Sequence, residues 1–264
     1  MIDLGLTGRV ALVTGAAVGI GRSVGCWLAC AGCDVALVDR DADPLGDAVE
    51  EVRAEGRRGL ARVDDLREDG AASVVVDDTI ASLGGLDIAV NNVGSLAGLA
   101  PASFLDQDEG YVHEVVSQNL LLTAACCRAE GRALTAAGHG GVIVNVSSGE
   151  STRPALGLAA YGAAKAAINQ LTQTLAVELG PAGVRVLAVA PGTTLTPTVR
   201  AALSDDYVRA LVGSIPLGRM NAPDDLAKLV VALVSDLGGG VTGQLVLADN
   251  GAHLARNRPR LEHA

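Results

Sequence analysis

A tyrosine and a lysine placed four residues apart could carry out acid–base chemistry in this chain. On a helix, Tyr161 and Lys165 would share one face. A lysine ammonium beside a phenol favours the phenolate and lowers the tyrosine pKa from its usual value of about 10. Such a tyrosine can pass a proton to or from a substrate oxygen, and Ser148, thirteen residues earlier, could hold that oxygen beside it. The alternatives are an ordinary surface pair at 161 and 165 and a helix cap or turn at Ser148.

The glycine-rich segment at residues 14–21, TGAAVGIG, could bind phosphate. Gly15 permits a sharp turn, Gly19 lets the backbone approach a phosphate, and Gly21 permits close packing of a following helix. The N-terminus of that helix would offer free N–H groups and the positive end of its dipole to a pyrophosphate. The spacing alone is weak evidence because the chain holds 33 glycines. Its position between an expected strand and an expected helix strengthens the prediction.

An acidic residue follows at the distance expected for a ribose contact. Asp39 ends the second apolar run, 18 residues after Gly21, where dinucleotide-binding folds place the acid that accepts hydrogen bonds from the adenosine ribose. A carboxylate there would repel a 2′-phosphate, which predicts NAD rather than NADP as the cofactor. Arg40 could instead hold a 2′-phosphate, although residues 16–18 bring no second basic group. Asp39 could also be a helix cap or a turn residue.

The elements that must position these residues alternate regularly along the chain. Short apolar runs alternate with longer amphipathic stretches, which predicts a parallel sheet covered by helices on both faces. We therefore expect an α/β, doubly wound fold that forms a single domain over residues 1–264, with a flexible tail at 255–264. Expected strands lie at 10–13, 35–38, 60–63, 86–90, 142–146, 184–189 and 244–248, and expected helices at 20–31, 43–55, 71–83, 111–135, 159–179 and 224–235.

Composition excludes several other classes of protein. The chain has 264 residues, of which 49% are hydrophobic and 19% charged, so it is long enough and apolar enough for a sizeable core. Its formal net charge of -10 disfavours nucleic acid and anionic membranes as partners. No apolar run reaches the roughly 18 residues of a membrane span, and the first residues lack the pattern of a signal peptide. We expect a soluble, cytoplasmic protein.

The cysteines and histidines do not predict a metal centre. Cys26, Cys30 and Cys33 have a spacing that some enzymes use for an iron–sulfur cluster. On a helix they would share one face, so we expect buried thiols that pack in the core. The pair at 126–127 is interpreted in the same way. The four histidines show no ligand spacing, and we expect no metal site.

With these motifs in hand, the chain resembles the short-chain dehydrogenase/reductases over about 250 of its residues. The matching motifs occur in the order of the family: the glycine loop at 14–21, Asp65-Leu66, Asn91-Asn92-Val93-Gly94, Asn119, Ser148, the Tyr161-Gly162-Ala163-Ala164-Lys165 segment, and Pro191-Gly192. The resemblance implies a Rossmann fold and a nicotinamide cofactor. It also implies pairing of the helices at 111–135 and 159–179 between subunits, in a homodimer or homotetramer.

The resemblance further implies roles for particular residues. Asn119 would hold a water that links Lys165 to solvent, Ser148 would orient the substrate oxygen, and Tyr161 would be the acid/base. Lys165 would also bind the nicotinamide ribose. The remaining cofactor contacts would come from the loop at the phosphates, from the ends of the strands, and from the segment beside the nicotinamide: Gly15, Gly19, Ile20, Gly21, Asp39, Asp65, Leu66, Asn92, Tyr161, Pro191, Gly192 and Thr194.

The predicted function is NAD-dependent oxidoreduction. It would interconvert a secondary alcohol and a ketone in a small to medium, partly hydrophobic substrate. One alternative is an NADPH-dependent 3-oxoacyl-[acyl-carrier-protein] reductase, which residues 215–219 resemble. The sequence lacks the basic residues expected for docking an acidic carrier at 135–139 and 176–178. Another alternative, a non-catalytic dinucleotide-binding sensor or scaffold, is disfavoured because the four residues expected at a catalytic site, at 119, 148, 161 and 165, are all present.

Two features bear on the substrate. Residues 195–216 lie where relatives carry a lid, and its inner face would be apolar: Leu195, Val199, Leu203, Tyr207, Leu211, Val212 and Ile215. Such a face favours a partly hydrophobic substrate, and the alternative is that these residues simply pack within the protein. Glu150, two residues after Ser148, could bind a hydroxyl or amine of the substrate or repel an acid. The alternative for Glu150 is a solvated loop position.

Overall fold

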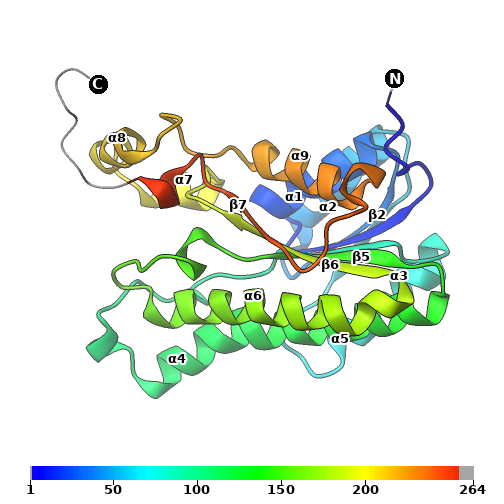
Figure 1. Ribbon diagram of the computed structural model, residues 1–264, viewed down its shortest axis with the longest axis horizontal. Helices are drawn as coiled ribbons and strands as arrows, with labels where there is room; N and C mark the ends of the chain where they lie inside the picture. Colours follow the sequence, from blue (N-terminus) through cyan, green and yellow to red (C-terminus); the bar gives the residue numbers. More distant parts are fainter. Residues whose placement is uncertain (1, 256–264) are drawn as a thin grey trace.

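Seven parallel strands form one sheet at the centre of the computed structural model, which describes residues 2–255 (Figure 1). The spatial order is β3-β2-β1-β4-β5-β6-β7. The strands are β1 Val10–Thr14, β2 Asp34–Asp39, β3 Gly59–Val63, β4 Ile88–Asn91, β5 Gly141–Val146, β6 Val184–Pro191 and β7 Leu245–Ala248. The predicted doubly wound Rossmann fold with a seven-stranded parallel sheet is confirmed.

The strand order reverses between β1 and β4. From β1 the chain builds β2 and β3 on one side and then returns to β4 on the other, with Val13 of β1 paired to Leu37 of β2 and Val90 of β4. The two connecting segments leave β1 and β4 in opposite directions, so a crevice opens at the carboxyl ends of these strands. This crevice is where the predicted phosphate loop lies.

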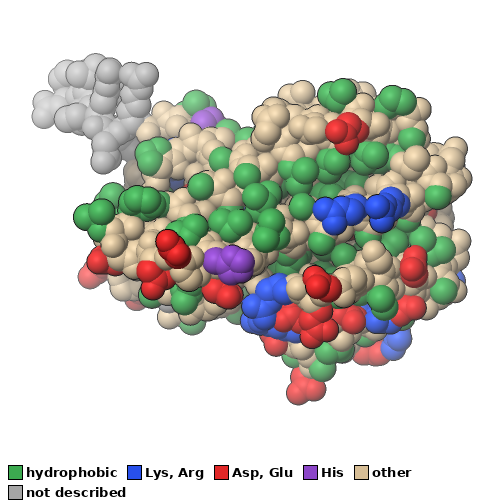
Figure 2. Space-filling view, turned by 90° about the horizontal axis from the view of Figure 1, so that it is seen from below, with side chains coloured by type: hydrophobic (Ala, Val, Ile, Leu, Met, Phe, Trp, Pro, Cys, Tyr) green, Lys and Arg blue, Asp and Glu red, His purple; other side chains and the backbone are tan. Residues whose placement is uncertain are grey.

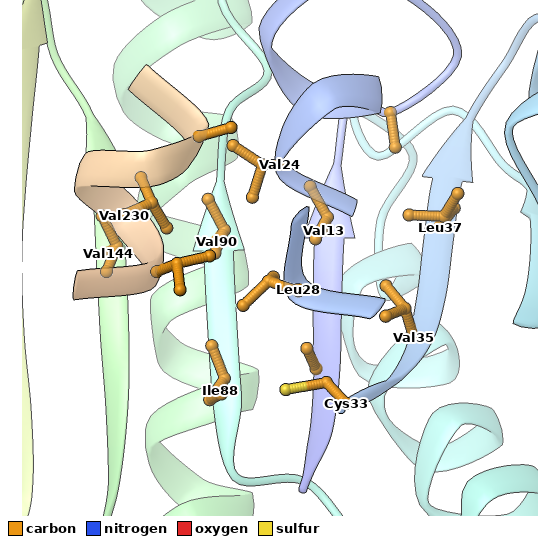
Figure 3. Close-up of a cluster of buried hydrophobic side chains, with 14 of the residues drawn as sticks. Val13, Val24, Leu28, Cys33, Val35, Leu37, Ile88, Val90, Val144 and Val230 are labelled. Carbon is orange, nitrogen blue, oxygen red and sulfur yellow. The ribbon is translucent and has the colours of Figure 1, made fainter. Parts of the chain in front are cut away.

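Two hydrophobic cores fix the sheet between layers of helices. One face is covered by α1 Gly19–Cys30, α2 Ala42–Ala54 and α9 Pro223–Val234, and the other by α3 Ala71–Leu83, α4 Glu109–Val116, α5 Leu122–Ala137 and α6 Ala159–Leu179. In the first core, Leu28 of α1 and Val230 of α9 pack against β-branched side chains of the central strands (Figure 3). Because both faces are covered, the central strands are apolar on both sides, as the sequence indicates.

The helix expected at 111–135 is interrupted. It begins at Glu109 as α4 and ends at Ala137 as α5, and a π-helical turn at Ser117–Leu121 joins the two parts. A π turn adds one residue to a helical turn, often at a functional site. Asn119 lies within this turn.

A polar cluster is buried between α5, α6 and the sheet. Glu130 of α5 is 1% exposed, and its Oε2 accepts a hydrogen bond of 2.8 Å from the Asn91 side chain of β4. Asn91 also donates to Asn145 of β5 (3.1 Å), which in turn donates to Thr172 of α6 (3.0 Å). Glu130 Oε1 has no hydrogen-bond partner. Burial raises the pKa of Glu130 to about 7.

The segment expected to form a lid contains α7 Pro197–Ala202 and α8 Asp205–Ser214. A third, small core lies beneath it. Its buried residues are Ile215, Met220 and Ala252, and Leu195, Val208, Leu211 and Val212 pack against them. The expectation for Tyr207 is wrong, because its side chain is 57% exposed. Ser204 caps α8 by accepting from the Tyr207 N–H, which begins the helix in a phase that turns Val208 inward instead.

The cysteines differ partly from expectation. Helix α1 ends at Cys30, which is exposed, and Cys26 is half-buried with its thiol donating to the Glu51 carboxylate at 2.9 Å. Cys33 lies beyond the helix and is buried. The prediction of one buried helical face is therefore wrong, because a polar partner and the helix end take two thiols out of the core. Cys126 and Cys127 are buried as expected.

Three further expectations concern the whole chain. Within residues 2–255, no helix has the length and apolar character needed to cross a membrane. In the same range, no three His, Cys, Asp or Glu side chains gather where they could hold a metal ion. The tail expected at 255–264 lies outside the described residues from 256 onward.

Candidate active site

The glycine-rich loop connects β1 to α1 and borders a groove of about 590 Å³. Gly15 and Gly19 have φ angles of +64° and +61°, a left-handed conformation that favours glycine. Helix α1 begins at Gly19, so its first free N–H groups lie at the groove. Ile20 also lines this groove. The structure therefore brings the predicted loop residues to one concave surface.

Asn92 fixes the shape of this loop from the neighbouring strand. Its side-chain Nδ2 donates to the Gly15 carbonyl at 2.9 Å, and its backbone N–H donates to Thr14 Oγ1 at 3.1 Å. Gly21 packs against the same Gly15 carbonyl, because a Cβ at residue 21 would lie 2.1 Å from its oxygen. Asn92 lines the groove as expected, and it also holds the loop together.

Asp39 lies at the end of β2, on the groove wall. Its Oδ2 accepts from the Ala17 N–H at 3.0 Å and its Oδ1 from the Arg40 N–H at 2.8 Å. The carboxylate is thus held in place by backbone donors. Four acidic residues line the groove, Asp39, Asp41, Asp64 and Asp65, against the single arginine Arg40.

Asp65 and Leu66 both line the groove next to Asp39. Leu66 is 6% exposed and offers an apolar wall. The Asp65 carboxylate is bonded to the Arg67 guanidinium, with 2.6 Å between Oδ2 and Nη2. Hydrogen bonding to Arg67 lowers the pKa of Asp65 to about 2. The side chain of Asp65 is therefore engaged by a neighbour, which leaves its backbone for other contacts.

Ser148, Tyr161 and Lys165 converge at the carboxyl edge of β5. Ser148 directly follows this strand, while Tyr161 and Lys165 lie in the first two turns of α6. Lys165 Nζ lies 5.8 Å from the centre of the Tyr161 ring and donates to the Val146 carbonyl at 2.9 Å. The Ser148 hydroxyl donates to the Glu150 carboxylate and lies close enough to the Tyr161 phenol to affect its pKa.

The pKa values of the two helix residues differ from expectation. Burial raises the pKa of Tyr161 to about 12, and the Glu150 charge adds to the rise. Burial also lowers the pKa of Lys165 to about 8, because the ammonium is only 2% exposed. The prediction that Lys165 lowers the Tyr161 pKa is wrong for this arrangement, since loss of solvent outweighs any attraction between the two groups.

Asn119 and Gly94 meet Lys165 from the other side. The Asn119 Nδ2 donates to the carbonyls of Ser95 (2.7 Å) and Val115 (2.8 Å), and its buried Oδ1 has no partner. A Cβ added to Gly94 would lie 2.5 Å from Lys165 Nζ and 2.7 Å from Asn119 Oδ1. Gly94 was not among the predicted site residues, although its place after β4 in the Asn91–Gly94 motif could have indicated this close approach.

Pro191, Gly192 and Thr194 lie at and beyond the end of β6, next to β7. The Gly192 N–H donates to the Ala248 carbonyl at 3.0 Å, and Thr194 Oγ1 donates to the Gly192 carbonyl at 2.9 Å. None of the three lines the 590 Å³ groove. They share its edge of the sheet, because the carboxyl ends of β5 and β6 are neighbours.

Comparison with known proteins identifies the family. A family model described as enoyl-(acyl carrier protein) reductase matches residues 15–253. The chain is 38% identical to a cyclohexanol dehydrogenase from Rhodococcus sp. (strain TK6) over 265 residues, covering 94% of this chain and 97% of that one. It is 35% identical to an L-rhamnose 1-dehydrogenase (NAD(P)(+)) from Sphingomonas sp. (strain SKA58), with 94% and 98% covered.

A solved structure agrees with these sequence matches. Carveol dehydrogenase from Mycobacterium avium in complex with NAD superposes with a TM-score of 0.89 at 28% identity, covering 95% of this chain and 99% of that one. Fold, motif order and sequence similarity thus agree over nearly the whole chain. The chain belongs to the short-chain dehydrogenase/reductase family and is an oxidoreductase.

Proposed function

We propose that the protein is an NAD(H)-dependent dehydrogenase that interconverts a secondary alcohol and a ketone, with Tyr161 as the acid/base. The observation that carries this proposal is the meeting of Ser148, Tyr161 and Lys165 at the carboxyl edge of the sheet. The substrate is proposed to be small to medium and partly hydrophobic, because the segment at 195–216 is rich in apolar side chains and one of them, Val199, lines the groove. That segment would act as the lid.

The groove fits a dinucleotide. When bound, the nicotinamide accepts or donates the hydride at the substrate carbon. Gly15, Gly19 and Ile20 would hold the pyrophosphate at the start of α1, and Asp39 would accept hydrogen bonds from the adenosine ribose. The fixed carboxylate of Asp39 and the acidic lining disfavour the 2′-phosphate of NADP.

The remaining predicted contacts follow the groove toward the reacting centre. Gly21 would keep α1 close to the loop. The other contacts would lie along the adenine, the ribose and the nicotinamide, and would come from Asp65, Leu66, Asn92, Lys165, Pro191, Gly192 and Thr194. For Asp65, the bond to Arg67 favours a backbone contact.

The proton route is proposed from the buried groups. The Tyr161 and Ser148 hydroxyls would hold the substrate oxygen between them, and Tyr161 would take the proton of an alcohol or give one to a ketone. The unpartnered Oδ1 of Asn119 fits a water bonded to Lys165, which would connect the site to solvent. Gly94 would leave the room for that contact.

A homodimer or homotetramer is proposed through the helices α4, α5 and α6. These helices lie on the lower side of the molecule in Figure 1, and Figure 2 shows apolar side chains spread across that side. Leu121 and Val177, on the π turn and on α6, are 54% and 78% exposed. Burial of such side chains against a second copy would remove apolar surface from water.

Binding and turnover test the proposal together. We expect NADH to bind more tightly than NADPH, and an Asp39→Ser variant to reduce this preference at least about tenfold, since it removes the charge that repels the 2′-phosphate. We expect Tyr161→Phe to lower the rate of alcohol oxidation about 100-fold or more with little change in NADH affinity. Full turnover by Tyr161→Phe contradicts the acid/base assignment.

The same assay examines the alternative activity. Faster reduction of a 3-oxoacyl thioester with NADPH than oxidation of any alcohol with NAD would favour the acyl-carrier-protein reductase. Binding of neither nucleotide would contradict both activities.

A further inference from the structure

The Glu150 carboxylate lies one hydrogen bond from the hydroxyl that is proposed to hold the substrate oxygen. Ser148 Oγ donates to Glu150 Oε2, and the short turn Gly149–Ser151 holds the two residues side by side directly after β5. Glu150 is half-buried. No lysine, arginine or histidine among residues 2–255 forms an ion pair with it. An unpaired negative side chain therefore adjoins the reacting centre.

This contact uses the only hydrogen of the Ser148 hydroxyl. A serine hydroxyl has one hydrogen to donate and two lone pairs to accept with. While that hydrogen is on the Glu150 bond, Ser148 cannot give it to the oxygen of an alcohol or a ketone. A substrate that brings its own donor to Glu150 would replace Ser148 there. Its arrival would free the Ser148 hydrogen for the reacting oxygen.

We propose that Glu150 is a specificity-determining residue, which selects substrates that carry a hydroxyl or a protonated amino group on the carbon next to the reacting carbinol. The substrate class is thus vicinal diols and β-amino alcohols. This inference rests on the proposed alcohol–ketone activity. The same negative charge disfavours substrates with a carboxylate at that carbon, since like charges repel at short range.

The size of the selection follows from the surroundings of Glu150. A buried site that hydrogen-bonds a substrate hydroxyl rejects the analogue lacking it by about 10⁴-fold or more. Glu150 is half-exposed, so water can replace part of the lost contact. We expect a preference of about tenfold to 100-fold in kcat/KM for a vicinal diol over the corresponding simple alcohol, which is about 1.4 to 2.8 kcal/mol.

The test compares four cyclohexanol compounds that differ only in the substituent on the carbon next to the carbinol. The substrates are cyclohexanol, 1,2-cyclohexanediol, 2-aminocyclohexanol and 2-hydroxycyclohexanecarboxylate, oxidised with NAD by the wild type and by Glu150→Leu, Glu150→Gln and Glu178→Gln. Glu178 is exposed on α6, so its variant controls for the change in net charge. Melting temperature and NADH affinity show that each variant is folded and binds cofactor.

The wild type and Glu178→Gln should prefer the diol and the amino alcohol. Glu150→Leu should lose this preference in two ways, by slower oxidation of the diol and by faster oxidation of cyclohexanol, because the Ser148 hydrogen is then free. A merely structural role for Glu150 would not raise the rate with cyclohexanol. Glu150→Gln should keep part of the preference for the diol. It should no longer discriminate between 2-aminocyclohexanol and 2-hydroxycyclohexanecarboxylate, which carry opposite charges.

Equal substrate ratios in the wild type and Glu150→Leu would overturn the proposal, as would a wild type that prefers cyclohexanol. Calorimetric binding of the four compounds to the NADH-loaded protein gives the same comparison without turnover. Binding that depends on Glu150, together with no oxidation of any ring, would contradict the proposed function and support the role of Glu150. Oxidation with unchanged ratios would contradict the role of Glu150 alone.

Discussion

Replacing Glu130 by glutamine should stabilise the protein at alkaline pH and have little effect at acidic pH. Burial raises the pKa of this carboxyl from 4.5 to about 7, so the folded chain holds a proton there that the unfolded chain releases between these values. Each unit of pKa corresponds to about 1.36 kcal/mol, so the free energy of unfolding should fall by about 3 kcal/mol as the pH rises from 4.5 to 7. The loss should be complete about one pH unit above the folded pKa, near pH 8.

The glutamine variant keeps the geometry and removes the charge. Its side-chain oxygen can still accept the hydrogen bond from Asn91, which the wild type makes at 2.8 Å. The difference in unfolding free energy between Glu130→Gln and the wild type should therefore grow by about 3 kcal/mol from pH 4.5 to pH 8. Urea unfolding followed by circular dichroism, at constant ionic strength, measures this difference at each pH.

A control separates the buried site from a general effect of charge. Glu178→Gln removes an exposed carboxylate and should change the unfolding free energy by less than about 0.5 kcal/mol at every pH. A difference between Glu130→Gln and the wild type that stays constant from pH 4.5 to pH 8 would refute the reasoning. It would mean that Glu130 remains ionised in the folded protein, with a donor on Oε1 that the structure does not contain.

Three further predictions concern the site and the core. Gly94→Ala should lower kcat about 100-fold, because the new methyl would lie 2.5 Å from Lys165 Nζ and 2.7 Å from Asn119 Oδ1; an unchanged kcat would contradict this contact. Alcohol oxidation should rise about tenfold per pH unit from pH 7 to pH 10, since the raised pKa of Tyr161, about 12, leaves little phenolate at lower pH; a plateau below pH 8 argues against Tyr161 as the base. Leu28→Ala should reduce the unfolding free energy by about 2–5 kcal/mol in urea titrations, because Leu28 is fully buried in the core of Figure 3; a loss below about 1 kcal/mol would show that the core collapses around the gap.

The pattern of apolar residues along the sequence predicted the sheet well, because it reflects which residues are buried. All seven strands begin and end within two residues of the expected ranges. The central strands are apolar runs enclosed by helices on both faces. The π turn at Ser117–Leu121 was not predicted, because one extra residue in a helix leaves the apolar pattern on each side intact. Tyr207 and Val208 are neighbours in the sequence, and in the helix that Ser204 caps it is Val208 that turns inward.

Residue types and their spacing predicted which side chains meet at the site. They predicted the pKa values of these side chains less well. Spacing placed Ser148, Tyr161 and Lys165 together, and the structure agrees with that placement. The direction of the Tyr161 pKa depends on how much water reaches the phenol, which a sequence does not specify. The bond between Ser148 and Glu150 likewise depends on the turn that follows β5.

The small core under α7 and α8 should let thermal stability and the rate of product release be changed independently of each other. Its three buried residues, Ile215, Met220 and Ala252, form a cluster apart from the two large cores beside the sheet. As the proposed lid, this segment would open with a free energy of its own, and its amide hydrogens should exchange faster than those of the central strands. Thermostabilising substitutions in the sheet should then leave product release unchanged. Tighter packing of this cluster should slow product release, even if the melting temperature hardly moves.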